Sequence, residues 1–204
     1  MKQGDAMLYQ IHRYPAELID VVKLTGGQRV VIRPVLPQDE GLTTAFFGDL
    51  PAPARYDRFM GPMRNLPPEL VKRFTNVDYT HHLALVAEVF EDDREIAVAE
   101  ARYVRGNDPS VAEFAVSVAD QWQGQGLASR LLGTLLCRAS TAGVQRMVGE
   151  TLASNDKMLH LARKAGFTAK RSPDVRGVML LEKIVEPATP GTPCHDAADE
   201  LAAA

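Results

Sequence analysis

The chain has 204 residues, of which 46% are hydrophobic and 24% are charged, and its formal net charge at pH 7 is -3. This balance is typical of a globular protein with a buried core, and the length predicts one domain, with two small ones as the alternative. No excess of basic residues indicates binding to nucleic acid or to a membrane surface. No stretch approaches the roughly 20 apolar residues of a membrane span, and residues 1–5 do not lead into a signal-peptide core, so we expect a cytoplasmic protein.

The two cysteines, Cys137 and Cys194, are expected to remain unpaired, as is usual in a reducing cytoplasm. Cys137 lies in an apolar helical run, which favours core packing over a nucleophilic role. Cys194 and its neighbour His195 supply only two candidate ligands in a tail segment, too few for a metal site. We therefore expect neither a disulfide nor a bound metal.

The first part of the chain is predicted to be an N-terminal extension, 1–28, followed by one strand and three helices. The strand is rich in β-branched residues and is closed by Pro34. The first helix opens with Pro37 and carries acids in its first turn, both typical of a helix start. These elements are expected at 29–35, 37–50, 51–60 and 66–77.

The middle of the chain predicts a meander, because three apolar strands at 82–90, 95–104 and 110–118 are separated by turn sequences. Beyond them helices and strands alternate. The apolar residues after Gly126 recur every fourth position, which predicts a helix that runs to about residue 142, where Gly143 ends it. A strand, a helix and two strands follow at 144–152, 154–166, 167–171 and 177–184.

Residues 186–204 are rich in proline, alanine and acidic residues, which predicts a disordered tail. The order of the other elements predicts a mixed α/β fold of the α+β type, with a partly antiparallel sheet.

Two glycines one residue apart, Gly124 and Gly126, stand where the third strand of the meander gives way to the apolar helix. Unpaired N–H groups and the positive end of the helix dipole meet at such a corner, which can bind phosphate. A plain tight turn is the alternative interpretation, since short glycine patterns are common. No Gly-Lys-Ser/Thr follows, so the corner is not a Walker loop, and without a third glycine it is a poor dinucleotide fingerprint.

The longer pattern, Gln123-x-x-Gly126-x-Ala128, resembles the coenzyme-binding signature of the GNAT N-acetyltransferases, Arg/Gln-x-x-Gly-x-Gly/Ala. The segment 154–167, "SNDKMLHLARKAGF", is similar to the second signature of that family. The resemblance covers about residues 29–185. It implies a GNAT acetyltransferase domain there, with a mostly antiparallel central sheet of about six or seven strands flanked by helices, and acetyl-CoA as the acyl donor.

A narrower resemblance is to the Pat-type bacterial protein-lysine acetyltransferases. It rests on four segments: 55–60, 76–88, 112–118 and 155–167. This resemblance implies acetyl transfer to a lysine ε-amine of a protein, with an AMP-forming acyl-CoA synthetase as the expected target. Many Pat-type proteins carry a large fused synthetase-like region, and nothing of that size is present in this sequence.

The resemblance also implies which residues meet acetyl-CoA. The backbone around the end of the third meander strand would bind the pantetheine arm, and the amides of the glycine corner would hold the diphosphate. Asn155 would contact the pantetheine arm, although capping the helix after it is an equally good interpretation of that residue. The predicted contacts are Val116, Ser117, Val118, Gln123, Gly124, Gln125, Gly126, Leu127, Ala128 and Asn155.

Acetyl transfer to a lysine needs a base, because the free amine has a pKa of about 10.4 and is protonated at neutral pH. Strand alternation puts Glu113 on the same face as Ala115 and Ser117, which leaves room for a substrate. The Glu at the matching position is the general base of Pat-like enzymes, so Glu113 is the predicted base. A solvated strand carboxylate is the alternative, and Glu150 is the second candidate base.

The sequence departs from the family at one point. Many GNAT enzymes place a tyrosine in the second helix as general acid, and Ala162 stands there in this chain.

Two further hypotheses remain open beside lysine acetylation of a protein. The chain could acetylate a small amine, which an acidic pocket would favour, or it could bind acyl-CoA as a non-catalytic sensor.

Overall fold

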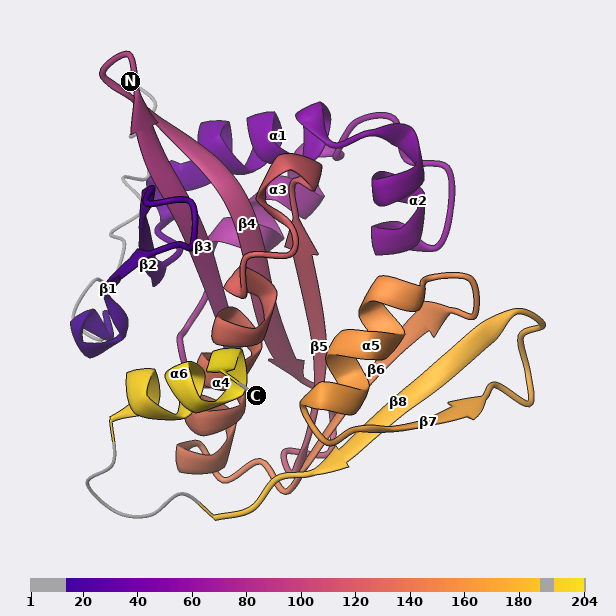
Figure 1. The fold of residues 1–204 in the computed structure, drawn as a ribbon. Coiled ribbons are helices and arrows are strands. Elements are labelled where there is room, and N and C mark those ends of the chain that lie inside the picture. Colours follow the sequence, from indigo (N-terminus) through magenta and orange to yellow (C-terminus); the bar gives the residue numbers. More distant parts are fainter. Residues whose placement is uncertain (1–13, 188–192, 204) are drawn as a thin grey trace, which may run out of the picture.

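The computed structural model describes residues 14–187 and 193–203. A single twisted sheet lies at the centre of the fold (Figure 1). Its strand order is β1-β2-β3-β4-β5-β6-β8-β7, and every neighbouring pair is antiparallel except β5 with β6. The strands are β1 (Asp20–Lys23), β2 (Arg29–Pro34), β3 (His82–Glu91), β4 (Arg94–Arg105), β5 (Val111–Val118), β6 (Arg146–Leu152), β7 (Thr168–Arg171) and β8 (Val178–Ile184).

Six α-helices and three short 3-10 helices accompany the sheet within these residues. The α-helices are α1 (Glu40–Asp49), α2 (Ala52–Phe59), α3 (Pro68–Thr75), α4 (Leu127–Thr141), α5 (Asp156–Lys164) and α6 (Cys194–Ala203), and the 3-10 turns are η2 (Ala16–Leu18), η3 (Pro37–Asp39) and η4 (Asp120–Trp122). The mixed, mostly antiparallel architecture expected from the sequence is confirmed.

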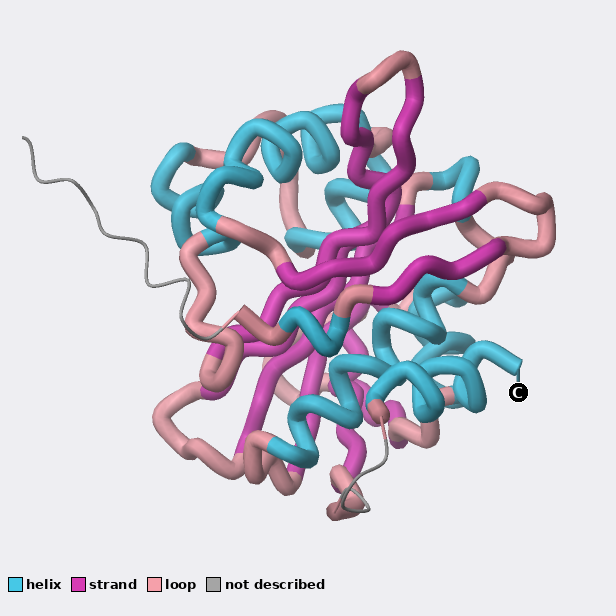
Figure 2. The backbone as a smooth tube through the Cα atoms, turned by 90° about the vertical axis from the view of Figure 1, so that its left-hand side faces the viewer, coloured by secondary structure: helices cyan, strands magenta, loops and turns pink. Residues whose placement is uncertain are grey.

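Helices cover both faces of the sheet (Figure 2), and a hydrophobic core lies on each face. The larger core includes Leu131 and Leu135 of α4 and Leu159 of α5, packed with one face of β3, β4 and β5. The smaller core includes Phe46 and Phe47 of α1, packed with the opposite face of β3 and β4. Alternation along each strand supplies both faces with apolar side chains, as a sheet covered on two sides requires.

The sheet has eight strands rather than the expected six or seven. The additional strand is β1, which lies within the segment predicted as an N-terminal extension and pairs with β2, from Asp20 opposite Ile32 to Lys23 opposite Arg29. Its sequence is too short to show a pattern that predicts a strand, and its pairing depends on the neighbouring edge of β2. Residues 1–13 of the predicted extension lie outside the described residues.

The predicted disordered tail is wrong for the residues that the structure describes. Helix α6 covers 194–203 and lies against α4, where Ala198 is 1% exposed. Gly133 of α4 makes this possible, since a Cβ at that position would stand 2.8 Å from the Cα of Ala198. Glu186, at the start of the predicted tail, accepts a hydrogen bond from Ser140 Oγ through its carbonyl at 2.7 Å. Residues 188–192 lie outside the described residues.

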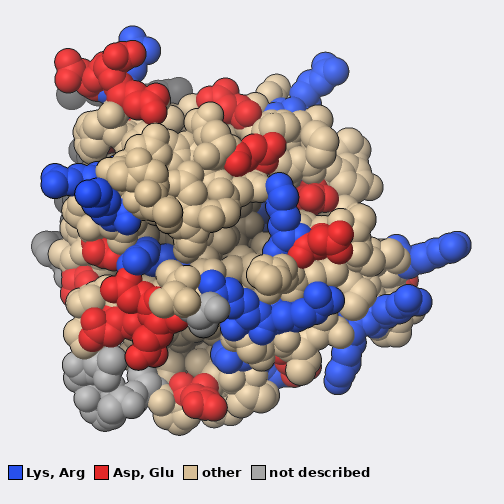
Figure 3. All heavy atoms as spheres, in the orientation of Figure 1, with Lys and Arg blue, Asp and Glu red and all other residues tan. Residues whose placement is uncertain are grey.

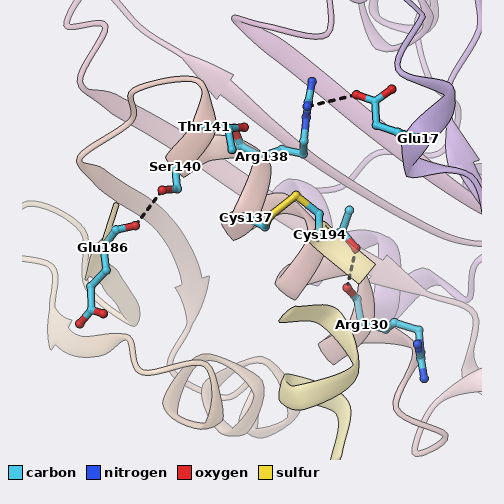
Figure 4. Close-up of a disulfide and its surroundings, with 9 residues drawn as sticks. Glu17, Arg130, Cys137, Arg138, Ser140, Thr141, Glu186 and Cys194 are labelled. Atoms are coloured by element: carbon cyan, nitrogen blue, oxygen red, sulfur yellow. Dashed lines mark hydrogen bonds and ion pairs between the residues drawn. A yellow bond between two sulfur atoms is a disulfide. The ribbon is translucent and has the colours of Figure 1, made fainter. Parts of the chain in front are cut away.

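The expectation of two free cysteines is also wrong. Cys137 and Cys194 form a disulfide that joins α4 to the first residue of α6, with the two Cα atoms 5.4 Å apart (Figure 4). The residues are 57 positions apart in the chain. Sequence reasoning missed the bond because it placed Cys194 in an unfolded tail, where no partner could be assigned.

A buried polar cluster stands on the face of β3 and β4 that α3 covers. Arg102 Nε donates to Glu100 Oε1 at 2.5 Å, and Arg102 Nη1 donates to His82 Nε2 at 3.1 Å. The same guanidinium lies over the ring of Phe74, with Cζ 3.6 Å from the ring centroid. Burial, and then the positive charge of Arg102, lower the pKa of His82 to about 4. His82 is therefore a neutral acceptor at physiological pH.

This pKa predicts a pH dependence of stability. In the unfolded chain His82 takes up a proton near pH 6.5, whereas in the folded protein it stays neutral down to about pH 4. The free energy of unfolding should thus fall as the pH drops from about 6.5 to 4, by up to about 3 kcal/mol. His82→Gln keeps an acceptor for Arg102 but cannot titrate, so urea unfolding at pH 4.5 and 7 should show a smaller pH dependence. The exposed His160→Gln is the control and should behave like wild type; an unchanged dependence in His82→Gln would contradict the assignment.

Candidate active site

A cleft of about 1120 Å³ opens between α2, the end of β5, the glycine corner and α5. Its volume is slightly above the range for small-molecule sites, which runs to about 1,000 Å³. One end is bordered by Leu50, Pro51 and Ala54, and the other by α5. In Figure 3 the central hollow is seen with Lys and Arg side chains gathered beside it.

The cleft exists because β5 and β6 diverge. Their parallel ladder covers three pairs, from Val111 opposite Arg146 to Glu113 opposite Val148. Beyond that point the ring of Phe114 lies over Gly149, where a Cβ would stand 2.8 Å from Phe114 Cε1. The rest of β5 stays paired with β4 but not with β6. A length of strand edge therefore faces the cleft, and an extended ligand can hydrogen-bond to such an edge.

The glycine corner, residues 123–128, lies at one end of this open edge. Gly124 has φ 73° and Gly126 has φ 82°, both in the left-handed region that glycine adopts without penalty. Gly126 is the N-cap of α4, and no side chain caps the helix. The first N–H groups of α4 thus have no acceptor within the helix, and the positive end of the helix dipole adds to them. The corner has the features of an anion site.

Two lysines of α5 that the sequence analysis did not single out also line the cleft. Lys157 Nζ donates to Gln123 Oε1 at 2.5 Å, which ties α5 to the glycine corner. Lys164 stands two turns further along the same helix face. Their spacing of seven residues was the available signal, because it puts both ammonium groups on one side of a helix.

Three cleft residues carry buried hydrogen-bond donors with no partner among the described residues: Arg58 Nε, Ser117 Oγ and Trp122 Nε1. An unpaired buried donor costs about 1–3 kcal/mol, so such groups are rare unless a ligand satisfies them. Their concentration in one cleft indicates a ligand with several acceptor atoms. The thioester, amide and phosphate oxygens of an acyl-CoA fit this donor set.

Arg58 has a particular environment at the end of the cleft near α2. Its Cζ lies 5.1 to 5.7 Å from the ring centroids of Phe47, Phe59 and Phe74. Burial lowers the pKa of Arg58, and the carboxylates of Glu100 and Glu113 act in the opposite direction. The Arg58 side chain is thus a cation held by aromatic rings, within electrostatic range of the predicted base.

Most of the predicted coenzyme-binding residues lie together. Nine line the cleft: Val116, Ser117, Val118, Gln123, Gly124, Gly126, Leu127, Ala128 and Asn155. Gln125 does not line it, and its side chain donates to the Gln121 carbonyl. Asn155 also caps α5, accepting a hydrogen bond from Met158 N at 3.0 Å. Both interpretations of Asn155 are therefore compatible with the geometry.

The two candidate bases differ in position. Glu150 is exposed and lines the cleft. Glu113 is exposed on β5, on the same strand face as Ala115 and Ser117, but does not itself line the cleft. Ala162 is fully buried, and the cleft-lining residues that the structure describes include no tyrosine.

The described residues contain neither a candidate metal site nor a candidate membrane span. No group of three or more His, Cys, Asp or Glu side chains there is arranged to hold a metal ion. Within the same residues, no helix has the length and apolar character to cross a membrane.

Comparison with known proteins decides the family. A family model for the acetyltransferase (GNAT) domain matches residues 29–168. The chain belongs to the GNAT acetyltransferase family. It is an acyltransferase, and the expectation from the two sequence signatures is confirmed.

Two relatives and one solved structure show which members of the family the chain resembles. An acetyltransferase of Pseudomonas aeruginosa is 32% identical over 154 residues, which are 76% of this chain and 83% of the relative. The acetyltransferase Pat of Mycolicibacterium smegmatis is 32% identical over 167 residues, covering 81% of this chain but 49% of Pat. The crystal structure of the GNAT domain of S. lividans PAT superposes with a TM-score of 0.76 at 31% identity, covering 84% of this chain and 99% of that domain.

Two glycine variants, one in the glycine corner and one outside it, test the proposed anion site. Gly124 and Gly143 both have positive φ, and the described residues place no atom within 4 Å of a Cβ added at either position. Alanine at either site costs about 1 kcal/mol of backbone strain. Only Gly124→Ala should weaken acetyl-CoA binding, by tenfold or more in calorimetry, because its methyl group blocks approach to the main chain. Equal affinities for the two variants would exclude the corner as the diphosphate site.

Proposed function

We propose that the chain transfers the acetyl group of acetyl-CoA to the ε-amine of a lysine in a protein, as the likeness to Pat suggests. The observation that carries the proposal is the cleft itself. It joins an uncapped helix start with two glycines, an unpaired strand edge and three partnerless donors. Acetyl-CoA supplies the activated thioester that the amine attacks.

Each part of the cleft has a role in this proposal. The amides from Gln123 to Ala128 hold the diphosphate, assisted by the ammonium group of Lys157. The open edge of β5 around Val116–Val118 pairs with the pantetheine arm, and its N–H groups polarise the thioester carbonyl. Ser117 Oγ and Trp122 Nε1 gain acceptors when the coenzyme is bound.

The acceptor lysine approaches past α2. Tyr56 and Met60, at the surface of this helix and at its end, are 46% and 39% exposed. Large exposed apolar side chains beside a cleft are typical of a surface that docks a protein. They favour a protein substrate, and we retain an AMP-forming acyl-CoA synthetase as the expected target.

The lysine must lose a proton before it attacks. We assign this step to Glu113, which lies on the strand face of Ala115 and Ser117 and within electrostatic range of Arg58 at the cleft end. Since Glu113 is outside the cleft lining, proton transfer through one water molecule fits its position. With Ala162 in place of a tyrosine, the leaving thiolate takes its proton from solvent.

Substitution of the two carboxylates tests the assignment. Glu113→Gln should lower kcat/KM by about 10²- to 10⁴-fold at neutral pH and leave the Kd for acetyl-CoA unchanged, because only the proton acceptor is lost. Glu150→Gln should change kcat/KM less than threefold. The reverse pattern would identify Glu150 as the base, and two silent variants would contradict general-base catalysis by either residue.

The acceptor is tested directly. Purified protein, acetyl-CoA and an AMP-forming acetate-activating synthetase should yield one predominant acetyl-lysine in mass spectrometry, with loss of synthetase activity as the lysine loses its charge. An unmodified synthetase would contradict this target. Acetyl-lysine proteomics of a deletion strain against its parent then identifies other protein acceptors.

Asp57 and Glu150, which both line the cleft, favour a small cationic amine as the second candidate acceptor. Acetylation of spermidine with no modified protein lysine would support that function instead. Binding of acetyl-CoA without transfer to either acceptor would support a sensor.

A further inference from the structure

Helix α6 is fixed to α4 at its start and to α5 near its end. At its start, the disulfide joins Cys194 to Cys137 (Figure 4). Near its end, Lys164 Nζ of α5 donates to the carbonyl oxygen of Ala202 at 3.2 Å. Between them Asp199 forms an ion pair with Arg130 of α4. The far end of α6 thus stands beside the coenzyme cleft.

Close packing against α4, one ion pair and one hydrogen bond hold α6 in place besides the disulfide. Its packing face consists mainly of small residues, with Ala198 over Gly133 and Leu201 half-buried. Asp199 is 56% exposed, and an exposed ion pair contributes little to stability. A ten-residue helix is also marginal in isolation. Loss of the disulfide, the covalent tie of α6 to α4, is therefore the change that would weaken its docking most.

Docked α6 affects the electrostatics of the proposed diphosphate site. Lys164 lines the cleft, but its ammonium group is bonded to Ala202. A Cβ on Gly126 would lie 3.8 Å from the Cβ of Ala202, so the last turn of α6 adjoins the glycine corner. The C-terminal end of a helix carries a partial negative charge, which opposes binding of an anion nearby. Docking of α6 thus holds the Lys164 ammonium group at the Ala202 carbonyl and brings a negative helix end to the site.

We propose that Cys137 and Cys194 form a reversible thiol–disulfide site that controls the affinity of the cleft for acetyl-CoA. In the oxidised form, α6 is locked in place and Lys164 is held by Ala202. In the reduced form, α6 detaches, and Lys164 turns to the phosphates of the coenzyme. The ligand in this inference rests on the proposed function.

The chemistry requires a dithiol reductant, and the disulfide is accessible to one because both cysteines are only partly buried. A thiolate of the dithiol attacks Sγ of one cysteine, and the other cysteine leaves as a thiolate. The second thiolate of the dithiol then attacks the dithiol's own sulfur in the mixed disulfide, and the bonded cysteine leaves as a thiolate. The dithiol is oxidised to its disulfide by two electrons, and Cys137 and Cys194 end as two thiols after protonation.

The first measurement needs no ligand. Hydrogen–deuterium exchange of the full chain, oxidised or reduced with dithiothreitol, should show the amides of α6 exchanging at least tenfold faster after reduction, while those of α5 change little. Unchanged protection of α6 would overturn the proposal. Cys194→Ser should behave like the reduced protein with or without dithiothreitol.

The second measurement is calorimetry with acetyl-CoA, whose sulfur is capped and cannot itself reduce the disulfide, after removal of dithiothreitol under argon. The Kd should be about ten- to a hundredfold lower for the reduced protein, the range expected for gaining one charge-assisted phosphate contact. Equal or weaker binding by the reduced form would overturn the proposal. Absence of binding in both forms would instead contradict the proposed function, and with it the ligand assigned to the switch.

Two lysine variants separate this switch from a general loosening of the fold. Lys164→Met should remove most of the difference in Kd between the oxidised and reduced forms, because the contact with Ala202 is gone and only the effect of the helix dipole remains. Lys157→Met, whose native side chain bonds to Gln123 rather than to α6, should weaken binding in both forms and keep the difference. A difference of undiminished size in Lys164→Met would contradict the assigned route.

Discussion

The divergence of β5 from β6 is the constraint on which the rest of the molecule depends. The ladder between them ends at Glu113 opposite Val148, and the ring of Phe114 lies over Gly149 just beyond it. Any larger residue at position 149 would collide with that ring. Because β5 keeps its partner on the other side, the divergence exposes one strand edge without dissolving the sheet. A binding cleft is thus built into the middle of an otherwise continuous sheet.

Each element around the opening contributes groups that suit the binding of an acyl-CoA, and each does so for a local structural reason. At the end of β5, two glycines in left-handed conformation turn the chain into a helix with no side-chain cap, so main-chain donors face the cleft. The α5 helix contributes lysines, and α2 contributes a guanidinium among aromatic rings. Unpaired buried donors are costly in a resting protein, and in the proposed function the coenzyme offsets that cost on binding.

The parts of this arrangement that the sequence predicted are those with local signals. Alternation along β5 separated Phe114 from Glu113, and the spacing of Gly124 and Gly126 before an apolar helix located the corner. The sequence did not predict the contacts between distant segments. The pairing of β1 with β2, the disulfide from Cys137 to Cys194, and the bonds of Lys157 and Lys164 all depend on which segments the fold brings together. For α6 a weak signal existed, since Cys194, Ala198 and Leu201 share one helix face, but its acidic and alanine-rich composition favoured disorder.

A crystal structure of the chain with acetyl-CoA tests the central claim most directly. The account predicts diphosphate oxygens about 2.7–3.2 Å from main-chain nitrogens between Gln123 and Ala128, with the pantetheine arm along the unpaired edge of β5. Coenzyme bound away from the glycine corner, or an arm that makes no hydrogen bond to β5, would contradict it.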